Sequence, residues 1–117
     1  MHNNLVLSAS TLIGDDVVNL AGENLGELEE IMLDVGTGQV AYAVLSFGGF
    51  LGMGDKLFAI PWEALQVDTE KEAFILDLAR EDLENAPGFD KDDWPSTIER
   101  DFLIEIHQFY GYKPYWE

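Results

Sequence analysis

The feature that most constrains this chain is a glycine-rich stretch that leads into an apolar segment and stops at a Pro-Trp pair. Residues 46–62 read SFGGFLGMGDKLFAIPW. Glycines let the chain bend between two strands, and Pro61 must end the second strand because proline has no amide hydrogen for the ladder. Phosphate-cradling loops instead precede a helix, whereas here Lys56 leads into a strand. The stretch therefore predicts a bend and a contact surface rather than a nucleotide site.

The length of the chain indicates one compact unit. A domain of 117 residues buries roughly two-thirds of the surface that its unfolded chain exposes. The chain has no cysteine, which excludes a disulfide framework and thiolate metal sites and fits a reducing compartment. No window approaches the roughly 18 apolar residues of a membrane-spanning helix. We expect a cytoplasmic protein without membrane insertion.

The charge balance disfavours nucleic acid as a direct partner. Six basic and 23 acidic residues give a formal net charge of -17. Such a charge repels phosphate backbones and anionic lipid within a Debye length. It is explained either by a solubilising surface or by a basic partner protein, and the sequence leaves both alternatives open.

Short extended segments separated by turn residues dominate the first eighty positions. The apolar positions of residues 26–34 change parity, which a bulge near Glu29 would explain. Residues 39–47 are apolar on both faces, which indicates a central or doubly covered strand. Six short strands in about sixty residues favour a small β-barrel, in which closure removes most unpaired edges. The six predicted strands are residues 16–19, 26–34, 39–47, 57–60, 66–68 and 73–78.

A helical region and an aromatic tail follow the predicted barrel. Residues 62–65 and 80–85 each fit a short helical turn, and Ser96 with Glu99 forms a capping-box pattern before a longer helix over residues 97–110. Gly111 should end this helix, and the tail beyond it should lie across a surface because exposed rings favour aggregation. The helix face predicted to be buried consists of Ile98, Phe102, Ile106 and Phe109 or Tyr110.

No residue pattern in the chain indicates catalysis, a cofactor or a metal. Residues 90–101 begin like a calcium loop, but Pro95 stands where glycine is needed and Asp101 where glutamate is needed. Neighbouring carboxylates such as Asp15 and Asp16 act as acid and base only when burial separates their pKa values. His107 has no sequence-near partners at metal-ligand spacing. We therefore assign no catalytic, cofactor-binding or metal-binding residue and expect no enzyme.

Four motifs in order resemble a known family. They are residues 10–14 (STLIG), 26–34 (GELEEIMLD), 41–46 (AYAVLS) and 59–62 (AIPW). Together they resemble a small stand-alone bacterial PRC-barrel protein over roughly residues 7–78, and residues 87–89 with the aromatic tail are similar to the extension of small members. The family includes the cytoplasmic part of the photosynthetic reaction-centre H subunit and the C-terminal domain of the ribosome maturation factor RimM.

The resemblance implies a fold and a class of function. The expected fold is mainly β, a six-stranded PRC-type β-barrel over residues 1–80 with a C-terminal α-helical extension over residues 81–117, packed as a single domain. Those relatives bind partner proteins and are not enzymes. Only docking onto another protein is carried over to this chain, because a fold does not by itself fix a function.

These inferences lead to two hypotheses of function. The first is a non-enzymatic adaptor module that binds another protein and self-associates as a homodimer, with aromatic and methionine side chains as anchors. The second is a small-molecule or metal-ion sensor that uses the barrel mouth or the acidic surface. The candidate interaction residues are Phe47, Phe50, Leu51 and Met53 around the glycine loop and Tyr112, Tyr115 and Trp116 in the tail. The same seven side chains would alternatively complete the core of the monomer.

Overall fold

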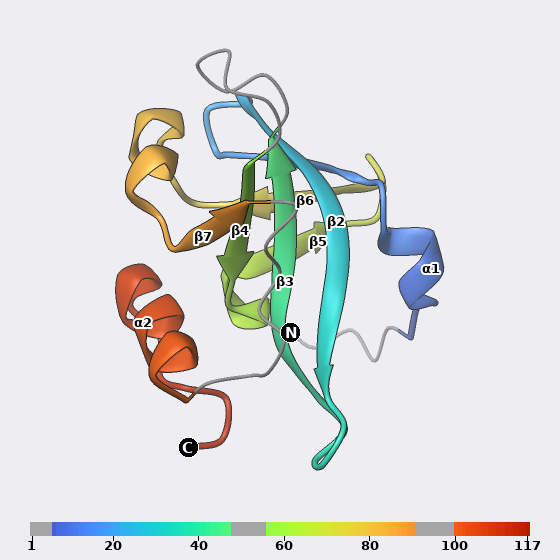
Figure 1. The fold of residues 1–117 in the computed structure, drawn as a ribbon. Coiled ribbons are helices and arrows are strands. Elements are labelled where there is room, and N and C mark those ends of the chain that lie inside the picture. The colour runs from blue at the N-terminus through green and yellow to red at the C-terminus, as the bar shows by residue number, and fades with distance from the viewer. Residues whose placement is uncertain (1–5, 48–55, 91–99) are drawn as a thin grey trace.

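The described part of the chain forms one seven-stranded sheet with a helix beside it (Figure 1). The computed structural model describes residues 6–47, 56–90 and 100–117. The sheet order is β5-β6-β1-β2-β3-β4-β7, and all neighbours are antiparallel except β1 and β6. The strands are β1 (Asp16–Val18), β2 (Asn24–Asp34), β3 (Gln39–Phe47), β4 (Lys56–Ile60), β5 (Leu65–Asp68), β6 (Ala73–Leu76) and β7 (Gly88–Asp90).

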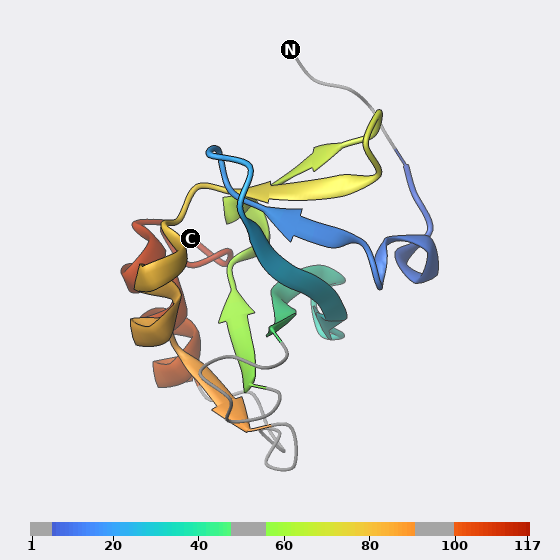
Figure 2. The same ribbon diagram turned by 90° about the horizontal axis from the view of Figure 1, so that it is seen from above.

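The mainly β fold with a C-terminal helix is confirmed, but the sheet is not a closed cylinder. Among the described strands, β5 pairs only with β6, and β7 pairs only with β4. The sheet curves strongly instead, so that β5, β6 and β1 run across the direction of β4 (Figure 2). The seventh strand, β7, lies in the segment predicted as a helical extension. The structure thus agrees with a barrel-like PRC fold, with one strand more than the six expected, and no second described strand pairs with β5 or with β7.

The long strand β2 bends where the sequence predicts a bulge. Its register against β3 shifts between Leu28 and Glu30, and again between Met32 and Leu33. Gly26 adopts a φ of 131°, and a Cβ at this position would collide with the carbonyl oxygen of Ser46 on β3. The strands β2 and β3 approach each other so closely where the sheet turns that only glycine avoids this collision.

The core consists of two hydrophobic clusters that meet at β3. The first cluster lies inside the curved sheet and includes Leu45, Phe58 and Phe74. The second lies between the sheet and α2 (Arg100–Tyr110), and it includes Tyr42 and Ile106. Since β3 contributes buried residues to both clusters, the prediction of a doubly covered strand is confirmed.

The face of α2 that packs on the sheet differs from the predicted stripe. Ile106 is fully buried as expected, but the other buried residues of the helix are Leu103 and His107. Phe109 is 38% exposed, whereas Tyr110 packs against the first cluster. The buried face of α2 is thus rotated toward His107. The prediction missed this because it favoured aromatic residues over a histidine for the interior. Ile98, Ser96 and Glu99 lie outside the described residues.

Gly111 ends α2 as predicted. Its φ is 79°, a left-handed conformation that favours glycine. The N–H of Tyr112 donates to the carbonyl of His107 at 2.9 Å, and the N–H of Gly111 donates to that of Gln108 at 3.2 Å. These two bonds form a Schellman motif, which turns the chain back toward the sheet and directs the aromatic tail over the second cluster.

Short helical elements precede or connect the described strands. The turn predicted at residues 10–14 is a one-turn helix, α1 (Ala9–Leu12). Two 3₁₀ helices, η2 (Trp62–Ala64) and η3 (Arg80–Asn85), occupy the positions where helical turns were predicted. The first follows Pro61 directly, as expected where proline ends a strand.

Candidate functional site

One outer edge of the sheet is strand β5, whose outer side pairs with no other strand in the described part of the chain. The register of β5 against β6 begins with Leu65 opposite Leu76, but the N–H of Leu65 donates to the carbonyl of Trp62. We infer from this that the residues of β5 that exchange backbone hydrogen bonds with β6 are Gln66 and Asp68. Hydrogen-bonding direction alternates along an antiparallel strand, which places the N–H and C=O of Val67 on the outer side. Val67 is also 40% exposed through its side chain. This edge offers both a backbone template and an apolar contact.

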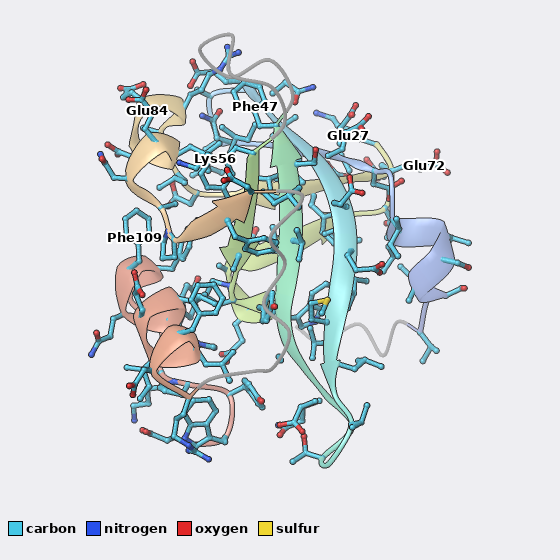
Figure 3. The ribbon with its side chains drawn as sticks, viewed as in Figure 1. Glu27, Phe47, Lys56, Glu72, Glu84 and Phe109 are labelled. Carbon is cyan, nitrogen blue, oxygen red and sulfur yellow. The ribbon has the colours of Figure 1, made fainter. Side chains whose placement is uncertain are left out.

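A groove of about 250 Å³ lies beside this edge, between α1 and the turn that joins β5 to β6. Figure 3 shows Glu72 at this turn, close to α1. The groove combines exposed apolar side chains with three carboxylates. Its lining residues are Leu7, Thr11, Leu12, Asp15, Val67, Asp68, Thr69, Glu72 and Ala73.

The carboxylates of the groove crowd one another. Burial raises the pKa of Asp15 above its usual value, and the negative charges of Glu72 and Asp16 raise it further. Asp68 accepts hydrogen bonds from the N–H groups of Glu70 and Lys71 at 3.1 and 3.2 Å, which shapes the turn. The groove therefore carries negative charge that a cationic partner would neutralise.

At the opposite end of the sheet, Phe47 marks the entry to the glycine loop. Its ring is half-buried against the first cluster, and the guanidinium of Arg80 lies 5.1 Å from the ring centroid. Phe47 is thus in contact with its own chain. Phe50, Leu51 and Met53 lie outside the described residues, so their role as interaction residues stays a prediction.

The aromatic tail lies across the surface of its own chain. The Tyr115 hydroxyl donates to Oδ2 of Asp34 at 2.6 Å, and the Gln39 amide donates to the Tyr115 carbonyl at 3.4 Å. Arg100 places its guanidinium 4.6 Å from the ring centroid of Trp116. Tyr115 and Trp116 are half-buried over the second cluster, whereas Tyr112 remains 39% exposed.

The bond between Tyr115 and Asp34 shifts the pKa of both groups. The donated hydrogen bond holds the pKa of Asp34 below its usual value. Desolvation first, and then the bond to Asp34, raise the pKa of Tyr115 to about 12. On both groups the effect of the bond is to favour the ionised carboxylate with the neutral phenol.

His107 occupies the interior, a position that the sequence did not indicate. The residue is 1% exposed, its ring packs near the rings of Tyr115 and Trp116, and its Nδ1 lies 2.7 Å from the Leu103 carbonyl. The ring also lines a second cavity under the tail. The pattern could have suggested this burial, because His107 follows Leu103 and Ile106 at helical spacing.

The described residues contain no group of three or more His, Cys, Asp and Glu side chains that could hold a metal ion. None of the described helices has the length and apolar character to cross a membrane. The β5 groove was also missed from the sequence, because the expected closure of the barrel would remove most unpaired edges. Among the described residues, the side chains thus form an acidic groove beside the edge of β5 and, elsewhere, a cavity beside a buried imidazole.

Comparison with known proteins places the chain in a family. The PRC-barrel domain family matches residues 5–83, which is most of the chain and spans β1 to β6. The chain therefore belongs to the PRC-barrel family, as the sequence motifs indicated. Membership suggests a small interaction module rather than a particular partner. No curated protein gave a significant match.

Proposed function

We propose that this chain is a non-enzymatic protein-interaction module that docks an extended segment of a basic partner onto β5. The observation that carries this proposal is the outer edge of β5, which no strand within residues 6–47, 56–90 and 100–117 covers, beside an acidic, partly apolar groove. Partner strands commonly add to such edges, where main-chain bonds give affinity and side-chain pockets give specificity. The remaining alternative for the acidic surface, solubility alone, would not need a groove next to a free edge.

Charge and side-chain chemistry define the segment that fits. Leu7 and Val67 are 43% and 40% exposed and would contact an aliphatic side chain. Asp15 and Glu72 would attract a lysine or arginine beside it, because opposite charges speed encounter and fix register. The net charge of -17 adds a long-range attraction for any basic partner.

Fluorescence anisotropy with a labelled lysine–valine hexapeptide tests this docking mode. We expect saturable binding that weakens with salt, and no binding of the matching glutamate–valine hexapeptide. The decisive variant is Val67→Pro, which removes the outward N–H but leaves the ladder to β6 intact. It should weaken binding about tenfold, whereas Val67→Thr, which keeps the N–H, should stay within about threefold.

A second pair of variants separates the groove from general acidity. Glu72→Gln and Glu84→Gln remove the same charge, but Glu84 lies on η3, far from α1 (Figure 3). Only the change at Glu72 should weaken peptide binding. Equal effects of these two variants, or equal binding by Val67→Pro and Val67→Thr, would contradict docking at β5.

We also propose that the module self-associates through the glycine loop and the tail. Tyr112 supports this, because it is the tail ring with the largest exposure, and exposed aromatic residues are common interface anchors. Tyr115 and Trp116 are partly covered by their own chain and would contribute their remaining surface. Two copies of charge -17 repel each other, so association should strengthen with salt.

Light scattering at micromolar concentration tests self-association directly. We expect a species larger than the 13.1 kDa monomer. Its fraction should rise at high salt and fall in the Tyr112→Ser variant. Phe109→Ser serves as a matched control, because Phe109 is equally exposed on α2 but was not predicted as an anchor. A 13.1 kDa species alone at both low and high salt would exclude a stable dimer.

A further inference from the structure

The aromatic tail, residues 112–117, covers apolar side chains without being buried itself. All of its residues are half-buried or exposed. Tyr115 and Trp116 pack on the second cluster, whose buried members are at most 4% exposed. Tyr115 also lines two cavities of about 310 and 330 Å³, and it is the one lining residue that these cavities share. The tail thus fits loosely onto a closely packed surface, because gaps beside a ring forfeit dispersion contacts.

The surface that receives the tail keeps its shape by its own contacts. Oδ2 of Asp34 accepts the hydrogen of the Tyr115 hydroxyl at 2.6 Å, while Oδ1 accepts from the N–H of Gly36 at 3.0 Å. The N–H of Gly38 donates to the Asp34 carbonyl at 2.8 Å and closes the same turn. Because these turn bonds do not involve the tail, the carboxylate stays in place for any tail that carries the same tyrosine.

Gly111 sets the direction in which the tail returns to the sheet. Its φ of 79° is strained for any residue with a Cβ, although an added Cβ would meet no atom within 4 Å. A change of φ and ψ at such a hinge redirects the segment that follows it. Tyr115 follows Gly111 by four residues, so its backbone reaches at most about 14 Å from the hinge. Two copies that exchange tails must therefore meet near the end of α2.

The distribution of charge favours an approach of two copies through this region. Residues 100–117 hold two basic and three acidic residues and therefore a net charge of -1, against -17 for the whole chain. Like charges on facing surfaces repel each other and oppose association. Two copies consequently meet with the least repulsion when α2 and the tail of one face α2 and the tail of the other.

We propose that two copies of this chain form a dimer by exchanging their tails, so that each tail lies across the second cluster of the other copy. This inference rests on the proposed self-association and specifies its contact. Tyr115 of each copy then donates to Asp34 of the other. The contacts of the single chain are formed again between two chains, which is why exchange of an element is a low-cost route to a dimer. Tyr112, 39% exposed in the single chain, lies where the two tails cross.

Light scattering of Gly111→Ala tests whether dimer formation opens the turn. Alanine disfavours a φ of 79° and penalises the closed tail, whereas an opened hinge is free of this strain. Two hinges open in each dimer, so the dissociation constant of the dimer should fall about tenfold. Gly22→Ala introduces the same strain in the β1–β2 turn, at a φ of 85° with no atom within 4 Å. This control should leave the dissociation constant within about twofold.

Cross-linking locates each tail directly. The chain has no cysteine, so Gln39→Cys and Glu117→Cys each introduce a single thiol. The Gln39 amide donates to the Tyr115 carbonyl at 3.4 Å, and Glu117 follows two residues later, so the two positions lie close together. The two variants are mixed, one of them labelled with ¹⁵N, and treated with a short bismaleimide. Mass spectrometry should find position 39 linked to position 117 of the other copy, whereas Glu84→Cys, on η3, should give no link to position 39.

The outcomes separate tail exchange from self-association itself. A dimer without the link between positions 39 and 117 would overturn tail exchange and leave a dimer whose tails stay closed. A dimer that Gly111→Ala weakens or leaves unchanged would overturn it in the same way. A 13.1 kDa species alone, for both the wild type and Gly111→Ala, would contradict the proposed self-association as well.

Discussion

The two flanks of the sheet are built in opposite ways. On the α2 flank, which comprises α2, the tail and the end of the β2–β3 hairpin, side chains are tied together by a buried helix face and the bond from Tyr115 to Asp34. On the β5 flank, which comprises α1 and β5, no residue is buried and the outer side of β5 pairs with no described strand. The side chains of the α2 flank are therefore packed together, whereas those of the β5 flank remain accessible to a partner.

The packed α2 flank stabilises the fold, whereas the β5 flank is where we propose that a partner binds. Residues that bury apolar surface stabilise the fold, whereas regions with few buried contacts open easily and are common binding sites. The pKa shifts follow the same division. The Asp34 carboxylate on the α2 flank is favoured as an anion, whereas Asp15 on the β5 flank is disfavoured. Changes on the two flanks should consequently differ in size and in pH dependence.

The largest difference between the flanks should be the loss in free energy of unfolding when one side chain is truncated on each. Ile106→Ala removes a fully buried side chain of α2 and should lower the free energy of unfolding by about 3 kcal/mol. Val67→Ala on β5, where the side chain is 40% exposed, should cost less than about 1 kcal/mol. Urea unfolding of both variants measures the contrast. Similar losses would show that the β5 flank is as tightly packed as the α2 flank.

Replacing Tyr110 should raise the free energy of unfolding, by less than the amount that Ile106→Ala lowers it. Its hydroxyl is buried and has no hydrogen-bond partner among the described residues, and burial raises its pKa well above the usual value. Tyr110→Phe removes the unpaired group and should raise the free energy of unfolding by about 1 kcal/mol. Thermal and urea unfolding at pH 7 check this gain. A loss of stability would indicate that the hydroxyl is hydrogen-bonded in solution.

The bond between Tyr115 and Asp34 should produce stability that depends on pH. The folded pKa of Asp34 is lowered, so its contribution is present above the unfolded value of about 3.9 and is lost as pH falls through the folded value. The raised pKa of Tyr115, about 12, adds a contribution that is lost as pH rises from about 10 toward it. Tyr115→Phe removes both contributions. Its deficit in urea midpoint should be largest near neutral pH and shrink toward acid and toward alkali.

The contribution of Asp15 to stability should depend on pH with the opposite sign to that of Asp34. Because its folded pKa is raised, its favourable contribution is present below the unfolded value of about 3.9 and is lost as pH rises through the folded value. Asp15→Asn should therefore stabilise the protein at pH 7 relative to wild type, with the advantage decreasing in acid. The urea midpoints at several pH values measure this trend. A constant advantage across the range would exclude titration of Asp15 as its source.

Local patterns predicted the elements of the fold better than their assembly. Pro61 and Gly111 mark element ends in both the sequence and the structure, and the bulge at Glu29 follows from the changed parity of apolar residues. The open sheet was not predictable in this way, because strand closure depends on pairing between distant segments such as β5 and β7. The burial of His107 was missed because a histidine becomes an interior residue only when a carbonyl, here that of Leu103, accepts its hydrogen.

Amide hydrogen exchange of the β5–β6 hairpin tests the central claim that β5 is an open edge. The outward N–H of Val67 should exchange rapidly in the free protein, while the amide of Phe74 on β6, which lies between β5 and β1, should be strongly protected. Adding the lysine–valine hexapeptide should then slow exchange at Val67. Equal protection of Val67 and Phe74 in the free protein would contradict the open edge and the docking mode built on it.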